Sequence, residues 1–372
     1  MITEAPLRRT VLALTLTVFA LPAYGLTAED INKATFAPVQ VEAAPVAPPI
    51  TPAPVAPAAP APEAAAPPAS AEAEAAAKKM PDPRVIKSQV LLDRRRLSPG
   101  AIDGYDGDNF RKAITELRRR AKLPDAGDLD AAVWAALDAD AATDIMTEYT
   151  VTAADAAYPF APTPKDYAEL AQLKMIGYRT AAEMIGERFH MDENLVRELN
   201  PTIENWKEGD RLVVAAIDFV MPSLSAGQTS SKSDLRAARI LVERGRGAVT
   251  AFDAQGEVLA IYPATVGSAD TPTPDGVYTV KGVARNPTYS YRPDVNFKQG
   301  NNTEKLTLPP GPNGPVGTVW IDLSKPTYGI HGTPEPSSVS KNASHGCVRL
   351  TNWDAEHLAS MTRPGVKVEF VE

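Results

Sequence analysis

The alternation of apolar and polar residues divides the chain into a helical part and a strand-rich part. Between residues 84 and 217, apolar residues recur at helical spacing, which predicts amphipathic helices. From about residue 237, short apolar runs such as ARILVE, GVYTVKGVA, GTVWIDL and VKVEFV are separated by glycine turns, which is typical of β-strands. We therefore predict a multidomain protein with helical modules followed by an all-β domain over 237–372.

The first helical module is expected over 84–140. Helical spacing predicts helices over 85–92, 109–122 and 130–137, and the glycine-rich stretch SPGAIDGYDG between the first two predicts a turn. Residues 84–122 hold eleven Lys or Arg against five Asp or Glu, a net charge of about +6. This excess indicates either a surface for a polyanionic cell wall or membrane, or a solvated helix face.

The second module is expected over 145–218. A helix is predicted over 181–189, and Asp192 is a good N-cap for a second helix that ends near Asn200. A closing strand is predicted at Arg211–Ala215, and its partner at 148–151 lies across an insertion.

Segments without a core-forming pattern separate these parts. Residues 1–25 carry Arg8 and Arg9 before an apolar run and end on small residues, which predicts a cleaved export signal or, as the alternative, an uncleaved anchor. The Ala/Pro-rich residues 26–83 and the polar residues 219–236 are expected to be linkers.

Composition excludes several classes of function. The net charge of −8 argues against nucleic-acid binding, and four scattered histidines with one cysteine form no set of metal ligands. We expect neither a metal nor a cofactor. A lone cysteine in an exported protein forms no internal disulfide, which leaves it either a buried apolar residue or a reactive thiol.

The segment HGCVRL favours the reactive thiol. In an extended strand, Val348 and Leu350 face one side, whereas His345, Cys347 and Arg349 face the other. Cationic neighbours lower the pKa of a thiol and so favour the nucleophilic thiolate. Backbone amides at Gly346 and Cys347 can bind an oxyanion.

The motifs IHGT and SHGCVRL, at 330–333 and 344–350, resemble the signature of the L,D-transpeptidase catalytic domain, also called the YkuD domain. The stretches RNPTYSYRP, LPPGPNGPVG and IHGTPEPSS are similar to the subgroup that includes the ErfK/YbiS-type enzymes. The resemblance extends over roughly 237–371. It implies a transferase in which Cys347 attacks a peptidoglycan tetrapeptide stem, releases D-Ala and forms a thioester.

The resemblance also implies roles for the neighbouring residues. His331 is the expected base, oriented by a backbone carbonyl near Gly332 and Thr333, because a histidine from a separate segment can meet the sulfur head-on whereas His345 leaves the strand parallel to Cys347. Support of the site is expected from Ser344, His345 and Gly346. Substrate contacts are expected from Arg349 and from Tyr289, Tyr291 and Asn296 of the long polar segment 286–316, a predicted lid.

The helical modules carry weaker resemblances. PGAIDGYDGDNFRKAI is similar to the three-helix peptidoglycan-binding-1 domain, and residues 177–217 resemble the βααβ LysM module, which binds N-acetylated glycans. Together these features predict a periplasmic enzyme whose partner is peptidoglycan. The acceptor of the acyl group is a second stem, a lipoprotein or water, and with water the enzyme is an L,D-carboxypeptidase. A non-catalytic wall-binding protein is a separate alternative.

Overall fold

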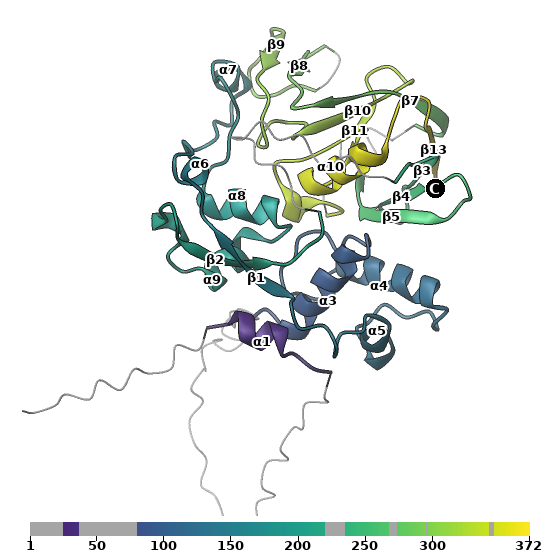
Figure 1. The fold of residues 1–372 in the computed structure, drawn as a ribbon. Helices are drawn as coiled ribbons and strands as arrows, with labels where there is room; N and C mark the ends of the chain where they lie inside the picture. The colour runs from purple at the N-terminus through teal and green to yellow at the C-terminus, as the bar shows by residue number, and fades with distance from the viewer. Residues whose placement is uncertain (1–24, 37–79, 220–234, 268–273, 295–296, 342–345) are drawn as a thin grey trace, which may run out of the picture.

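The computed structural model describes residues 25–36, 80–219, 235–267, 274–294, 297–341 and 346–372 (Figure 1). Most of the predicted export signal and of the two predicted linkers lies outside these residues. Within them, no helix is long and apolar enough to cross a membrane.

The first module contains the three predicted helices, α3 (Pro83–Arg94), α4 (Asp108–Ala121) and α5 (Ala131–Ala136). Asp82 caps α3 and Asp130 caps α5, each accepting a hydrogen bond from a first-turn amide. Phe110 and Ile114 of α4 are buried in the core shared with α3. The helical pattern thus located all three helices.

The segment expected to be a linker over 26–83 begins with ordered structure instead. Residues Ala28–Asn32 form the short helix α1, capped by Thr27, and Ile31 is fully buried. The Asn32 side chain accepts hydrogen bonds from the amides of Ile145 and Met146, and Lys87 donates to the Asn32 carbonyl. These contacts hold residues 26–36 against both modules. The alanine- and proline-rich composition of 26–83 as a whole gave no sign of this short ordered segment.

The second module has the predicted βααβ order. Strand β1 (Met146–Thr150) pairs antiparallel with β2 (Arg211–Ala215), and α8 (Ala181–Arg188) and α9 (Glu193–Leu199) lie between them in sequence, followed by the 3₁₀ turn η1 (Ile203–Asn205). Asp192 caps α9, as predicted. The insertion between β1 and α8 holds two one-turn helices, α6 (Ala153–Ala156) and α7 (Tyr167–Leu170).

The C-terminal domain is built on a mixed nine-stranded sheet in the order β5-β4-β3-β13-β7-β10-β11-β12-β6. These strands are β3 (Arg239–Glu243), β4 (Ala248–Phe252), β5 (Val258–Pro263), β6 (Thr265–Val266), β7 (Gly276–Arg285), β10 (Val319–Leu323), β11 (Gly329–His331), β12 (Val348–Arg349) and β13 (Lys367–Val371). A separate hairpin joins β8 (Tyr289–Tyr291) to β9 (Leu306–Leu308) in the predicted lid.

The domain is not all-β, and this corrects the prediction. Helix α10 (Asn352–Met361) follows β12 directly, begins at its N-cap Thr351 and packs against β10 and β11. Its Trp353, Leu358 and Met361 are buried. The helix is buried on most of its surface, so it lacks the polar stripe from which an amphipathic helix is recognised in a sequence.

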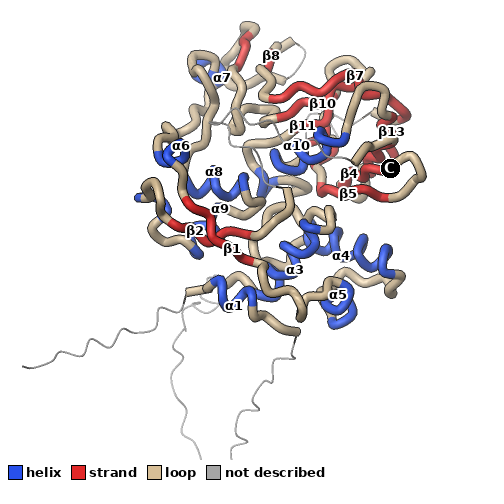
Figure 2. Tube along the Cα trace, viewed as in Figure 1, coloured by secondary structure: helices blue, strands red, loops and turns tan. Residues whose placement is uncertain are grey.

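The three parts pack against one another (Figure 2). After α3, the backbone of Arg96 and Ser98 pairs with Ile261 of β5 through two hydrogen bonds of 2.9 Å. This pairing forms an isolated bridge on β5, an edge strand of the nine-stranded sheet. The first module is therefore part of the structural support of the C-terminal domain.

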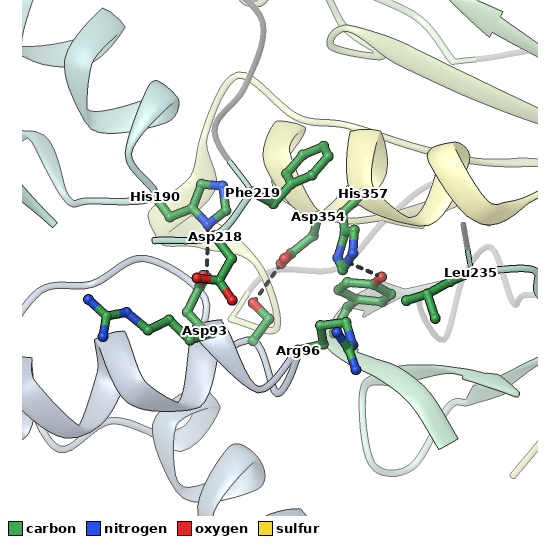
Figure 3. Close-up of a pocket in the computed structure, with 11 residues that line it drawn as sticks. Asp93, Arg96, His190, Asp218, Phe219, Leu235, Asp354 and His357 are labelled. Carbon is green, nitrogen blue, oxygen red and sulfur yellow. Dashed lines mark hydrogen bonds and ion pairs between the residues drawn. The ribbon is translucent and has the colours of Figure 1, made fainter. Parts of the chain in front are cut away.

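A cavity of about 190 Å³ lies where the three parts meet (Figure 3). His190, which follows α8, contacts Asp93 of α3 at 2.8 Å and stacks on Trp353 of α10. Ser98 donates to Asp354 of α10 across the same junction. His190 therefore packs at the C-terminal end of α8.

The basic residues of 84–122 mostly serve this packing. Arg94, Arg95 and Arg96 donate to backbone carbonyls of other segments, and Arg118 is buried against Asp130. The buried Glu116 pairs with arginines of its own helix and with Arg246 of the C-terminal domain. Other basic residues stay exposed, namely Arg111, Arg119, Arg120 and Lys122, and a partner for them remains a prediction.

Candidate active site

Cys347, Arg349 and His331 are brought together by neighbouring strands. Strand β12 runs parallel to β11, with His331 opposite Arg349. Val348 and Leu350 are buried in the core, whereas Cys347 and Arg349 are half-buried on the other face. The predicted division of the strand into a core face and a reactive face is confirmed for residues 346–350, while His345 and Ser344 lie outside the described residues.

His331 is a buried, neutral imidazole. Its Nδ1 lies 2.7 Å from the carbonyl oxygen of Gly332, and because a carbonyl only accepts, Nδ1 carries the hydrogen. Burial lowers the pKa of His331 to about 4, and the charge of Arg349 acts in the same direction. The Nε2 lone pair is therefore available to take a proton at neutral pH.

The ring of Trp320 packs against the imidazole of His331. It lies opposite His331 on β10, and the two rings stack with centroids 5.4 Å apart. Gly329 makes room for this ring, because a Cβ at that position would lie 2.6 Å from it. Trp320 was not predicted as a site residue, because in the sequence it is one more apolar residue of the predicted strand GTVWIDL.

The thiol of Cys347 rests in its protonated form, contrary to the expected thiolate. Burial raises the pKa of Cys347, while a backbone hydrogen bond from Gly329 and the charge of Arg349 oppose the rise. Sγ lies 3.7 Å from the carbonyl oxygen of Thr327. With a neutral imidazole and a raised thiol pKa, the resting site holds a neutral pair, and the proton has to move during the attack.

Both glycines of the site lie where a side chain would meet a neighbour. Gly346 has φ +101°, a region that favours glycine, and a Cβ there would lie 3.1 Å from the ring of Tyr328. A Cβ on Gly332 would lie 2.1 Å from Oδ1 of Asn352, so this glycine permits close packing. Thr333 is buried and its hydroxyl accepts from the Glu335 amide.

Asn352, the first residue of α10, holds this backbone in place. Its Oδ1 accepts from the amide of Thr318 at 3.3 Å, and its Nδ2 donates to both carboxyl oxygens of Glu187 at 2.9 Å. Glu187 belongs to α8 of the second module and is 2% exposed. The loop whose carbonyl orients His331 therefore rests on a contact with the N-terminal part of the chain.

Glu187 is held in its protonated form by this burial. Its pKa is raised to about 8, mainly by desolvation, while the hydrogen bond from Asn352 opposes the rise. A folded-state pKa above the ordinary value means that the folded protein binds this proton more tightly than the unfolded chain. The resulting stability is complete below about pH 4.5 and is lost as the pH rises towards 8.

Replacing Glu187 with glutamine is expected to remove this loss, because a neutral amide keeps the shape without the charge. One pKa unit corresponds to about 1.4 kcal/mol, so the wild-type free energy of unfolding should fall by on the order of 4 kcal/mol more than that of Glu187→Gln between pH 5 and 8.5. Denaturant unfolding across this range measures the difference. The exposed Glu208→Gln is the matched control, and parallel pH profiles for wild type and Glu187→Gln would contradict the expectation.

The lid tyrosines have different environments. Tyr291 is fully buried and its hydroxyl accepts from the Gln299 amide at 2.9 Å, so it supports the lid and is not exposed to a substrate. Tyr289 is half-buried, and burial raises the pKa of its phenol, with the nearby Tyr167 and Cys347 adding to the rise. Asn296 lies outside the described residues.

Within the described ranges, no group of three or more His, Cys, Asp or Glu is arranged to hold a metal ion. The site holds the thiol of Cys347, the neutral imidazole of His331 with its hydrogen on Nδ1, and the guanidinium of Arg349. This set suits acyl transfer through a cysteine.

Comparison with known proteins agrees with this chemistry. Residues 237–370 match the family model of the YkuD L,D-transpeptidase catalytic domain. A Bacillus subtilis protein described as "Putative L,D-transpeptidase YkuD" is 32% identical over 180 residues, which cover 44% of this chain and 94% of that protein. The Escherichia coli "Probable L,D-transpeptidase ErfK/SrfK" is 30% identical over 115 residues, 30% of this chain and 37% of that one.

Among solved structures, L,D-transpeptidase 3 from Mycobacterium tuberculosis aligns with 21% identity and a TM-score of 0.31, over 45% of this chain and 76% of that chain. The assignment to this family rests on the sequence relationships. The resemblance of the N-terminal part to the peptidoglycan-binding-1 and LysM modules remains a prediction.

Proposed function

Because the chain belongs to the L,D-transpeptidase (YkuD) family of enzymes, we propose that Cys347 cleaves peptidoglycan tetrapeptide stems through a thioester. The observation that carries the proposal is the neutral His331 on the strand beside Cys347, with its Nδ1 hydrogen directed to the Gly332 carbonyl. That hydrogen bond leaves Nε2 as the proton acceptor of the site. The family relationship and the oriented His331 favour an enzyme over a protein that only binds the cell wall.

The first half of the reaction transfers the stem to the enzyme. The thiol proton passes to Nε2 of His331 as sulfur attacks the carbonyl between diaminopimelate and the terminal D-Ala. The amides of Gly346 and Cys347 stabilise the developing oxyanion. His331 then protonates the leaving amine, D-Ala departs, and the acyl group remains on sulfur.

The second half depends on the acceptor. The amine of a second stem attacks the thioester, gives its proton to His331 and forms a 3→3 cross-link, after which the proton returns to sulfur. A lipoprotein lysine in its place attaches that protein to the wall, and water yields a trimmed tripeptide. The proposed location is the periplasm, where the acceptors lie, with the N-terminal modules bound to glycan strands.

Mass spectrometry of muropeptides tests the proposal. The full-length protein is incubated with tetrapeptide stems, and we expect release of D-Ala together with cross-linked dimers. Tripeptides alone would identify a carboxypeptidase, and a lipoprotein adduct formed only when that acceptor is added would identify an anchoring enzyme. The absence of both D-Ala release and a mass adduct on Cys347 would overturn the thioester mechanism.

A further inference from the structure

The second module contacts the C-terminal domain next to the loop that follows the catalytic base. Helix α8 contacts α10 (Figure 1). At this contact, Nδ2 of Asn352 donates to both carboxyl oxygens of Glu187 at 2.9 Å and to the Pro312 carbonyl at 3.1 Å. Asn352 and Glu187 are both buried. A buried amide with these partners has one favoured orientation, because turning it would leave polar atoms without a hydrogen bond.

The Oδ1 atom of Asn352 faces two glycines of the site. A Cβ on Gly332 would lie 2.1 Å from this oxygen and a Cβ on Gly317 would lie 1.9 Å from it, so both backbones pass close to the amide. Oδ1 also accepts from the Thr318 amide at 3.3 Å, and the Gly332 amide donates to the Val319 carbonyl at 3.3 Å. The orientation of the Asn352 amide therefore limits where the backbone of Gly332 can lie.

The insertion of the second module holds the same region from a second side. The Ile176 amide donates to the Pro310 carbonyl at 2.9 Å, and the Asn313 amide donates to the Ile176 carbonyl at 3.2 Å. Gly311 is required for this approach, since a Cβ there would lie 2.1 Å from the Ile176 oxygen. The segment 310–318, which contacts Gly332 through Gly317, is therefore bonded to the second module as well.

The carbonyl of Gly332 decides which nitrogen of His331 carries the hydrogen. It accepts from Nδ1 at 2.7 Å, which leaves the lone pair of Nε2 free to receive the thiol proton. In the other tautomer Nε2 would carry a hydrogen, and it could accept no proton from sulfur. The function of the base therefore depends on a carbonyl whose position depends on Asn352.

We propose that Glu187 is a positioning residue for His331, the catalytic base. Through Asn352 it keeps the Gly332 carbonyl in place and so holds the base in the tautomer that takes the thiol proton. This inference rests on the proposed function. It makes the chemistry of the C-terminal domain dependent on the docking of the second module, because α8 supplies the carboxyl that orients Asn352.

Two variants of the full-length protein remove the contact. Glu187→Met keeps the length of the side chain without an acceptor, and the milder Glu187→Asp withdraws the carboxyl by one methylene. Both should slow thioester formation at saturating tetrapeptide by roughly 10- to 100-fold, within the contribution of a positioned base. The tetrapeptide concentration that gives half the maximal rate should not change, because Glu187 does not touch the stem. Glu187→Gln keeps an acceptor for Asn352 and should restore most of the rate.

Nuclear magnetic resonance of nitrogen-15-labelled histidine rings measures the tautomer directly, and His331→Ala identifies the His331 signals. Wild type and Glu187→Gln should carry the hydrogen on Nδ1, whereas Glu187→Met and Glu187→Asp should carry much of it on Nε2. Tyr178→Phe is the matched control, because the Tyr178 hydroxyl donates to Glu187 at 3.4 Å from within the second module. It disturbs the same carboxyl without removing the bond to Asn352, and it should keep the wild-type tautomer.

The outcomes separate this inference from the proposed function. The wild-type tautomer in Glu187→Met and Glu187→Asp overturns the inference even if the rate falls, because a slower rate alone marks a structural role. An equal tautomer shift in Tyr178→Phe would assign the effect to loosening of α8 and overturns it as well. If the wild type forms no thioester, the proposed function is overturned, and the tautomer still decides whether Glu187 positions His331.

Discussion

Cys347→Ala is expected to abolish thioester formation and D-Ala release, because it removes the thiol that attacks the stem in the proposed reaction. The side chain is half-buried and its strand is held by pairing with β11 and β6. The free energy of unfolding should therefore change by no more than about 1 kcal/mol. Mass spectrometry of the intact protein after incubation with tetrapeptide measures the acyl adduct, and a thermal melt measures the fold.

Cys347→Ser is the companion variant. It keeps a polar group of similar size, but an alcohol is a much weaker nucleophile than a thiol under the same neutral base. Turnover should be absent or very slow in a folded protein. Release of D-Ala by Cys347→Ala at the wild-type rate would show that another group performs the attack and would overturn the assignment of Cys347.

His331→Ala is expected to slow acylation by tetrapeptide by about 10² to 10⁴, the usual contribution of a positioned base. Because His331 is neutral in the resting enzyme, it does not hold Cys347 as a thiolate. The pH profile of iodoacetamide labelling should therefore rise only above about pH 9 in both wild type and His331→Ala. A midpoint that is low in wild type and moves upward in the variant would instead indicate a resting thiolate–imidazolium pair.

His345→Ala separates the two histidines of the sequence motif. If His331 is the base, His345→Ala should lose less acylation activity than His331→Ala. The reverse order would exchange their roles. His357→Ala is less suitable as a control, because His357 hydrogen-bonds Tyr262 at the junction of the three parts.

The strand that carries Cys347 shows which features can be predicted from a local sequence pattern. Alternation alone separated Val348 and Leu350 from Cys347 and Arg349, since the side-chain period of a strand does not depend on its neighbours. The protonation states of Cys347 and His331 depend on burial, which the alternation of side chains along a strand does not reveal. Sequence suggested cationic neighbours and hence a thiolate, whereas desolvation keeps both Cys347 and His331 neutral.

The supporting residues were missed for a related reason. Glu187 is one polar residue of the predicted helix over 181–189, and no motif marked Asn352. Their pairing joins residues 165 positions apart and places a protonated carboxyl under the loop that orients the base. A charged residue type gives no sign in sequence that its side chain will be neutral and buried.

The sequence by itself determined the three helices of the first module, the βααβ order of the second and the two faces of the strand that carries Cys347, because periodicity, capping and alternation are local. Only the tertiary structure decided that the modules are not independent. Residues 96–98 pair with the edge strand β5, and Gln299 of the segment 286–316 accepts a hydrogen bond from the insertion at Tyr167. Such contacts form between surfaces distant in sequence, and their free energy comes from shape, burial and desolvation that no single segment encodes.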